Sequence, residues 1–207
     1  MRILHKSYKL HIKEIFINIC TDLFTGIICL IYNILICHGY KRVCYYTNWS
    51  QYRKGIGRFV PENIDVNLCT HLIYAFAKLD GNQLAPVEWN DDTTPWSKGM
   101  YERFNNFKLE NPSLRTILAV GGWNFGSKPF SDMASVPASR SEFVNSTMTF
   151  LRKRNFDGLD LDWEYPARRG GPPQDKVNLA SLVKELRLAF EEESKVSRRP
   201  RLLLTMA

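Results

Sequence analysis

The chain has 207 residues, of which 44% are hydrophobic, 13% are aromatic and 24% are charged, with a net charge of +7. This composition is typical of a globular protein and excludes an intrinsically disordered one. The basic residues lie in short, separated groups at 152–154, 168–169 and 198–201, without the interleaved aromatic residues of a nucleic-acid surface. We therefore expect no nucleic-acid partner. The length suits one ordinary domain or part of a larger one.

The N-terminal segment differs from the rest of the chain. Residues 23–37, LFTGIICLIYNILIC, form an uncharged apolar run after a basic lead. The run is shorter than the roughly 20 residues of a membrane-spanning helix and is typical of a signal-peptide core. Because Cys37 and Gly39 are small residues at the positions that signal peptidase reads, we expect residues 1–39 to be removed and the protein to be secreted and extracellular. An N-terminal anchor that stays uncleaved is the alternative.

The cysteines support export. Three of the five lie within residues 1–39, which leaves Cys44 and Cys69 as an even pair. A disulfide between them is the simple outcome in an oxidising compartment. Two buried free thiols remain the alternative, because the sequence does not give their separation in space.

Two triplets match the acceptor motif for N-linked glycosylation, at Asn48 and at Asn145. The first lies at the end of a predicted strand and the second in a predicted helix. Neither triplet by itself is strong evidence for a glycan.

From residue 40 onward, strand and helix patterns alternate. In chain order they predict strands over 42–49 and 70–79, a weak helix over 95–111, a strand over 115–123, a helix over 139–154, a strand over 156–165, a helix over 176–194 and the start of a fifth strand over 201–207. The strands are nearly continuous in apolar residues, as strands buried on both faces should be. This order predicts a parallel α/β sheet, either doubly wound or a barrel.

Two of the helices carry further signals. The helix over 139–154 begins with Ser139 and Glu142 at the spacing of a capping box. The helix over 176–194 has an apolar stripe, made of Val177, Leu179, Ala180, Leu182, Val183, Leu186 and Phe190. Both helices should therefore cover the sheet with one face.

The ends of the predicted strands indicate where function lies. No glycine-rich phosphate-binding fingerprint follows the first strand, which weakens a nucleotide-binding interpretation. The carboxyl ends carry aromatic and acidic residues instead, namely Trp49, Phe76, Trp123, Glu164 and Tyr165. In barrel enzymes, functional residues gather at that end of the strands.

The strand over 156–165 contains an unusual group of carboxylates. Residues two apart in a strand point to the same side, so Asp160, Asp162 and Glu164 should share one face, with apolar residues on the other. Like charges that lie this close raise the pKa of at least one member. Glu164 is nearest the open end and is the natural proton donor. Asp157 has the opposite parity, and we expect it to support the entry of the strand.

Two alternative roles for the acidic group stay open. A metal site is one, although no histidine lies nearby and a hard cation would require more oxygen ligands from loops. A purely structural cluster of acids is the other. We expect no metal and no cofactor.

The stretch DGLDLDWEYP resembles the DxxDxDxE signature of glycoside hydrolase family 18 chitinases, and RTILAVGGWNFG resembles their second signature strand. The resemblance continues through RVCYYTNWSQYR, CTHLIYAFAKL and RLLLTMA, so it covers essentially residues 41–207. It implies a parallel (β/α)8 TIM barrel, of which residues 40–207 supply about the first four βα units and the start of strand five. The domain over 40–207 would thus be part of a catalytic domain.

The resemblance also implies a reaction. Family members hydrolyse β-1,4 linkages between N-acetylglucosamine units of chitin, with retention of configuration and with the acetamido group of the substrate as nucleophile. By position, Glu164 matches the general acid and Asp162 the residue that holds the acetamido N–H. Asp160 matches the residue that shares a proton with Asp162. The implied partners are chitin or chitooligosaccharides, and no obligate protein partner is evident.

Further roles follow from the same resemblance. The positions implied to bind substrate are Tyr45, Trp49, Phe76, Gly121, Gly122, Trp123 and Tyr165. Aromatic faces suit the apolar C–H faces of pyranose rings, although Trp49 and Trp123 could instead be core aromatic residues. Cys44 and Cys69 match a disulfide that ties the first strand to the second.

The chain departs from the family pattern in extent, because a closed barrel has eight strands and about 250 residues. We expect a fragment or a truncated gene model. We expect this chain alone to be inactive, with the acids facing water across an open half barrel. A chitooligosaccharide-binding lectin and a non-functional fragment are the alternatives. Retention of Glu164 favours an enzyme, because such lectins usually replace that residue.

Overall fold

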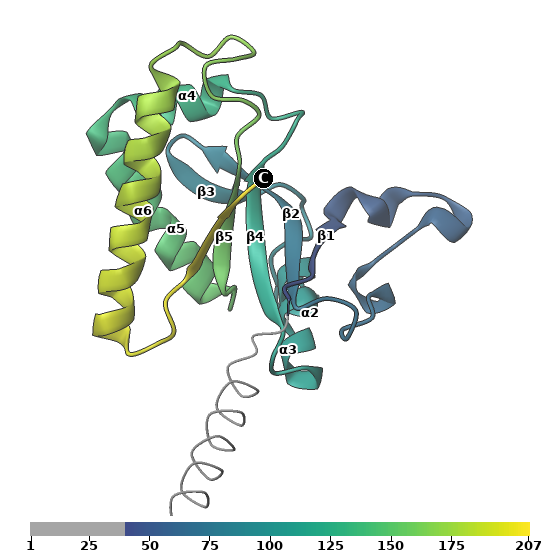
Figure 1. The fold of residues 1–207 in the computed structure, drawn as a ribbon. Coiled ribbons are helices and arrows are strands. Elements are labelled where there is room, and N and C mark those ends of the chain that lie inside the picture. Colours follow the sequence, from purple (N-terminus) through teal and green to yellow (C-terminus); the bar gives the residue numbers. More distant parts are fainter. Residues whose placement is uncertain (1–39) are drawn as a thin grey trace, which may run out of the picture. The chain divides into compact units, whose positions relative to one another are not determined.

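The computed structural model describes residues 40–207, and the predicted signal segment at 1–39 lies outside the described residues. Five parallel strands form an open sheet in the order β1 (Val43–Thr47), β2 (His71–Asp80), β4 (Arg115–Gly121), β5 (Gly158–Asp162) and β6 (Leu203–Met206) (Figure 1). The order follows the sequence without a reversal. Barrels wind in this way, whereas a doubly wound sheet reverses its strand order. The predicted α/β fold is confirmed, as a partial barrel.

Helices connect the strands and cover one face of the sheet. They are α2 (Met100–Asn105), α3 (Phe107–Glu110), α4 (Lys128–Ser135), α5 (Pro137–Lys153) and α6 (Asp175–Ser197), with short 3-10 helices η1 (Asn48–Tyr52), η2 (Gly55–Gly57) and η3 (Pro61–Asn63) after β1. Figure 1 shows α4, α5 and α6 grouped on one side of the sheet. The other face is left for the functional residues.

The two faces of the sheet differ in what they bury. Leu159 and Leu161 of β5 point toward the helices and join one large core with Phe143 of α5 and Leu182 of α6. Each such buried side chain contributes about 1.5–3 kcal/mol. The opposite, inner face carries a small apolar cluster, made of Ile73, Ala75, Ile117 and Ala119. Alternation along the strands therefore separates a packing face from an inner face, as the sequence predicts.

The predicted capping box of α5 is wrong. The helix begins earlier, at Pro137, and Val136 occupies the cap position without a side-chain hydrogen bond. Proline favours the first helical position because its fixed φ is already helical. The Glu142 carboxylate instead accepts hydrogen bonds of 2.9 Å each from the side chains of Asn82 and Gln83.

Those two residues belong to a hairpin that the sequence did not predict. β3 (Gln83–Pro86) pairs antiparallel with the end of β2. Helix α4 was missed as well, because its short stretch follows the glycine-rich end of β4 without a long apolar period.

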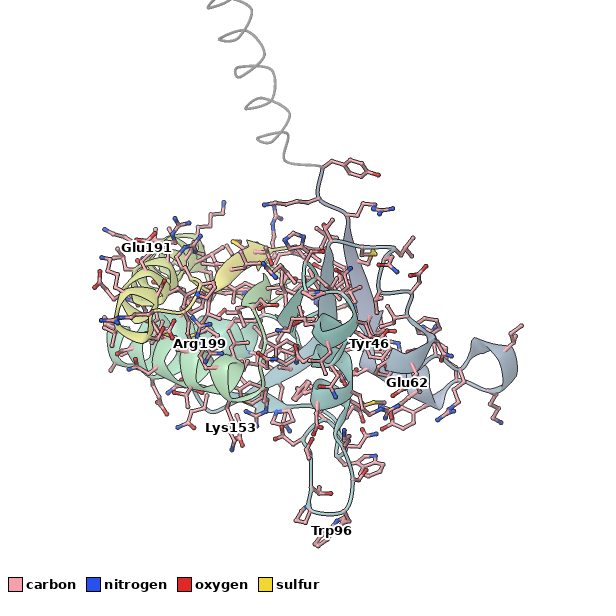
Figure 2. The ribbon with its side chains drawn as sticks, turned by 90° about the horizontal axis from the view of Figure 1, so that it is seen from below. Tyr46, Glu62, Trp96, Lys153, Glu191 and Arg199 are labelled. Carbon is pink, nitrogen blue, oxygen red and sulfur yellow. A yellow bond between two sulfur atoms is a disulfide. The ribbon has the colours of Figure 1, made fainter. Side chains whose placement is uncertain are left out.

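The weak helix predicted over 95–111 is corrected to two short helices, α2 and α3. Residues 94–97 form a tight turn instead, in which the Thr94 N–H donates to the Ser97 carbonyl at 2.9 Å. Trp96 stands at the tip of this turn and projects from the body of the molecule (Figure 2).

The stripe predicted for α6 is only partly correct. Leu182, Leu186 and Phe190 are fully buried, but the Val177 side chain is 58% exposed. Val177 precedes Leu182 by five residues, so at about 100° per residue it lies well off the buried line.

The Cys44–Cys69 disulfide is present and joins β1 to the segment that enters β2. The prediction of this pairing is confirmed. Within residues 40–207, no helix combines the length and apolarity that crossing a membrane requires.

Candidate active site

The three acids predicted to act together lie at the carboxyl end of β5. Asp160 and Asp162 belong to the strand, and Glu164 follows two residues after it. Asp160 is 1% exposed and Asp162 is 7% exposed, while Glu164 is half-buried. The expectation that these acids face water is therefore wrong for the two aspartates, because neighbouring side chains cover them.

Two hydroxyl groups hold Asp160 from opposite sides. The Tyr45 hydroxyl of β1 donates to Oδ2 at 2.7 Å, and the Thr205 hydroxyl of β6 donates to Oδ1 at 2.5 Å. β1 is three strands away from β5 in the sheet order, a distance of about 14 Å along a flat sheet. The contact with Tyr45 therefore requires the sheet to curl around its inner face, as in a barrel.

The environment of Asp162 disfavours its ionised form. Burial, followed by the charges of Glu164 and Asp160, raises the pKa of Asp162 to about 6. Burial and the hydrogen bond to Asp160 also raise the pKa of the Tyr45 hydroxyl, so Tyr45 remains a donor at neutral pH. A carboxyl group with a pKa near 6 can hold or release a proton under mild conditions.

Two aromatic residues of the predicted site pack against each other. The rings of Trp49 and Phe76 are stacked, with centroids 5.9 Å apart and an interplanar angle of 15°. Trp49 lies in η1 and not at the end of the strand, because β1 ends at Thr47. Trp49 is 44% exposed, so part of this residue is accessible to a ligand.

Gly121 and Gly122 have a packing reason to be glycine. A Cβ on Gly121 would lie 2.2 Å from the Asp162 carbonyl oxygen, and a Cβ on Gly122 would lie 2.7 Å from the Phe76 ring. Both glycines also have positive φ, at 115° and 86°. They let the end of β4 approach β5 and Phe76 closely. A contact with sugar at these positions stays a prediction.

Arg169 links two of the predicted site residues and was missed in the sequence. Its guanidinium carbon lies 3.8 Å from the centroid of the Trp123 ring. Its Nη1 donates to the carbonyl of Trp123 at 2.8 Å and to the carbonyl of Glu164 at 3.0 Å. Arg169 thus ties the tryptophan after β4 to the acid after β5. Tyr165, the last predicted aromatic residue, is half exposed beside them.

Ser127 was also missed, and it contacts the residues on both sides of Glu164, the side chain of Trp163 and the backbone of Tyr165. The Trp163 indole N–H donates to the Ser127 hydroxyl at 2.6 Å, and this hydroxyl donates to the Tyr165 carbonyl at 3.0 Å. No local pattern marks Ser127, because its partners lie 36 and 38 residues away. Only the folded chain brings them together.

Asp157 lies at the opposite end of β5. Its Oδ2 accepts the Thr116 N–H at 2.8 Å and the Lys108 ammonium at 3.1 Å. Asp157 is therefore remote from the three acids. In the described part of the chain, no group of three or more histidine, cysteine or acidic side chains is arranged to hold a metal ion.

Known proteins resemble this chain in sequence and in fold. The chain is 50% identical over 167 residues to chitotriosidase-1 of Mus musculus, a match that covers 81% of this chain and 35% of the relative. An immunomodulatory active chitinase from Trichuris suis has a similar structure, with a TM-score of 0.74 and 40% identity over 81% of this chain and 43% of that chain. Human YKL-39, a pseudo-chitinase with retained chitooligosaccharide binding, superposes with a TM-score of 0.73 and 42% identity over 82% of this chain and 43% of its own.

The chain thus spans about a third of the length of the curated relative. Residues 41–207 match the family described as glycosyl hydrolases family 18. This match begins just before β1 and includes every strand of the sheet. With its sequential parallel strands and its row of acids at the end of β5, the chain belongs to glycosyl hydrolases family 18.

Proposed function

We propose that this chain supplies the acid-bearing part of a chitinase barrel, which hydrolyses β-1,4 linkages between N-acetylglucosamine units. The observation that carries the proposal is the row of Asp160, Asp162 and Glu164, in which burial and the neighbouring acids raise the pKa of Asp162 to about 6. Closely spaced carboxyl groups of this kind suit proton transfer near neutral pH.

The proposed mechanism has two steps. First, Glu164 donates a proton to the glycosidic oxygen, while the acetamido oxygen of the substrate attacks the anomeric carbon and the bond to the leaving sugar breaks. Asp162 accepts the acetamido N–H and stabilises the positive oxazolinium ion, with its proton shared with Asp160. Second, water attacks the anomeric carbon and gives a proton back to Glu164, while the bond from this carbon to the acetamido oxygen breaks and the acetamido group is restored. Two inversions leave the configuration retained.

Three exposed aromatic side chains support sugar binding beside the acids. Trp49, Trp123 and Tyr165 are all between 44% and 60% exposed, which leaves ring area for the C–H faces of pyranose rings. Phe76 supports Trp49 by stacking on it. Tyr45 would contribute through Asp160, to which its hydroxyl donates.

A chimera tests the proposal. Residues 41–207 of this chain replace the matching residues of mouse chitotriosidase-1, and release of a fluorophore from a chitobiose glycoside is measured. We expect turnover in the chimera and a loss of at least about 10²–10⁴-fold in its Glu164→Gln variant, because no other acid is placed to donate the proton. Turnover of that variant within about tenfold of the parent chimera would refute the role of Glu164.

The 207-residue chain itself is the second arm of this experiment. We expect it to show no turnover above its own Glu164→Gln variant, because the resemblance places further groups that position the acetamido group on later strands of the barrel. Such positioning can supply roughly 7–11 kcal/mol of a barrier. Clear turnover by the monomeric chain would contradict this expectation.

A chitooligosaccharide-binding lectin is the second candidate function, because one similar structure is a pseudo-chitinase that retains binding. A chimera that binds chitooligosaccharides without turnover would favour it. A chimera that neither binds nor cleaves, although it folds, would favour the non-functional fragment.

We also propose that residues 1–39 act as a signal peptide and that residues 40–207 form the extracellular part. The Cys44–Cys69 disulfide supports this, because disulfides persist in oxidising compartments. Mass spectrometry of material secreted by eukaryotic cells is the test. A mature N-terminus near Tyr40 is expected, and an intact Met1 would favour an uncleaved anchor.

A further inference from the structure

The folded chain treats its two N-glycosylation triplets very differently. In Asn48-Trp49-Ser50 the asparagine is 2% exposed, and its Nδ2 donates to the Phe76 carbonyl at 3.3 Å. The Ser50 hydroxyl lies 2.7 Å from the carbonyl oxygens of both Thr47 and Phe59, and its single proton can be donated to either of them. A glycan on Asn48 would have to occupy space that the end of β2 already fills.

The triplet Asn145-Ser146-Thr147 lies in the middle of α5 and is open at its asparagine. The Asn145 side chain is exposed and forms no hydrogen bond with any residue of the described part, 40–207. It borders a shallow groove of about 510 Å³ whose polar lining includes Gln83, Glu142, Thr149 and Lys153. Figure 2 shows Lys153 pointing outward at the end of this helix. A sugar on Asn145 would meet polar side chains and solvent.

Thr147 supplies a second, independent observation. Its side chain is fully buried, and its hydroxyl has no hydrogen-bond partner among residues 40–207. Such a group is unfavourable in a folded protein and requires a physical reason. A valine would have almost the same shape without the unpaired oxygen. The hydroxyl therefore has no evident role in the folded chain, whereas the glycosylation motif requires a hydroxyl at this position.

We propose that Asn145 is an N-linked glycosylation site and that Asn48 is not. The donor is a lipid pyrophosphate-linked oligosaccharide that begins with N-acetylglucosamine. The Asn145 amide nitrogen forms a bond to the anomeric carbon of that sugar and loses one proton to a base. The bond from this carbon to the phosphate oxygen breaks, and the lipid pyrophosphate leaves with the electron pair.

The structure also indicates when the modification occurs relative to folding and where the glycan lies relative to the proposed active site. Because Thr147 is buried once α5 packs, the transfer to Asn145 precedes packing of this helix. Asn48 is excluded at the folding step, since a chain with a glycan on Asn48 could not bury this residue against the end of β2. α5 lies on the helix-covered side of the sheet, so the glycan points away from the inner face that carries Asp160 and Asp162 (Figure 1). The modification and the proposed catalysis are therefore independent.

The test uses the full 207-residue chain behind a cleavable secretion signal, expressed in insect cells. Microsomes are treated with protease, and only protected chains are scored, so the result does not depend on residues 1–39. We expect one increment in mass that an endoglycosidase removes. Asn145→Gln and Thr147→Val should abolish the increment, and Asn48→Gln should keep it. Deglycosylation in heavy-oxygen water should label residue 145 as it becomes aspartate.

The Thr147→Val variant also separates a role of the hydroxyl in modification from a role in stability. If the hydroxyl serves only the modification, the melting temperature of the unglycosylated variant should equal or exceed that of the parent. A melting temperature more than about 4 °C below that of the parent would show that the Thr147 hydroxyl has a structural role. The unpaired hydroxyl would then no longer support the proposed glycosylation. Protected parent chains without an increment, or an increment lost in Asn48→Gln and kept in Asn145→Gln, would overturn the proposal.

Discussion

Two aspartates of the same strand region, Asp157 and Asp162, have opposite surroundings. Asp157, at the start of β5, accepts a backbone N–H from Thr116 and pairs with the Lys108 ammonium. Asp162, at the other end, is buried beside Asp160 and Glu164, and its pKa rises to about 6. The first carboxylate has a cation and a backbone N–H beside it, whereas the second is buried beside two further carboxyl groups, which disfavour its ionised form.

This difference follows the two ends of a barrel strand. The amino ends of the strands meet where packing and pairing stabilise the sheet, and the carboxyl ends meet where loops build a site. One residue type therefore serves stability at one end and proton chemistry at the other. Mutations at the two ends should separate the two properties.

The largest expected effect on stability is that of Asp157→Ala. It leaves the Thr116 N–H without its acceptor and the mostly buried Lys108 ammonium without its anionic partner, with only the Asn155 carbonyl still accepting from it, which should lower the free energy of unfolding by about 2–4 kcal/mol. Glu164→Gln should change it by less than about 0.5 kcal/mol, because Glu164 is half-buried and not part of the core. Urea denaturation of the 207-residue chain measures both.

The matched control for this comparison is Lys108→Met, alone and combined with Asp157→Ala. If the ion pair is the reason, the double variant should lose less than the sum of the two single variants. Additive losses would show that Asp157 acts through Thr116 alone. Equal effects of Asp157→Ala and Glu164→Gln would remove the contrast between the two ends.

The next largest expected effect is a pH dependence of stability that comes from Asp162, at the carboxyl end of β5. The pKa of Asp162 is raised on folding to about 6, so its stabilising contribution is present below about pH 4 and is lost as the pH rises through 6. Relative to Asp162→Asn, the parent chain should therefore lose on the order of 1–2 kcal/mol between pH 4 and pH 6.5. Urea denaturation at several pH values gives this difference.

Asp91 also affects the pH dependence of stability, but it does not affect the difference between the parent and Asp162→Asn. Burial raises its pKa to about 6 as well, in a region packed against Tyr74 and away from the inner face. Its contribution is the same in both proteins and cancels in the difference. A pH-independent difference between the parent and Asp162→Asn would show that Asp162 is not perturbed by its neighbours.

Ser127→Ala should have a smaller effect, because it removes one buried hydroxyl that bridges Trp163 and Tyr165. We expect a loss of about 1–2 kcal/mol in the free energy of unfolding. In the chimera, we expect kcat to fall more than KM rises, because Glu164 lies between the two bridged residues. Rescue of kcat by Ser127→Thr would support positioning, and a change in KM alone would contradict it.

The smallest expected effect is that of Arg169→Gln, which removes the cation that stacks on the exposed Trp123 ring. An exposed contact of this type contributes about 0.5–1 kcal/mol, so KM of the chimera for a chitooligosaccharide should rise by about 2–5-fold. Arg168→Gln is the matched control, since it removes the same charge one residue away. Equal rises in both variants would indicate a general charge effect.

The sequence by itself determined the parallel α/β pattern, the strands and the longer helices. Continuous apolar strands and long amphipathic helices are local signals, so β2, β4 and α6 could be predicted close to their observed bounds. The strand predicted over 156–165 exists as β5 but is shorter, and it ends before Glu164. The alternation of Asp160, Asp162 and Glu164 with apolar residues is also a local signal. It could be recognised in the sequence because side chains of a strand alternate between its two faces every second residue. The family resemblance came from the same motifs.

The tertiary structure alone decided what those acids touch. Tyr45 and Thr205 reach Asp160 from 115 and 45 residues away, which requires the curl of the sheet. Arg169 and Ser127 have no local pattern, and their contacts depend on where two loops meet at the end of β5. Burial of the acids likewise depends on neighbouring strands. Local sequence patterns reveal the periodicity of a helix or strand. Contacts between residues far apart in the sequence form only when the chain folds, so they cannot be predicted from local patterns.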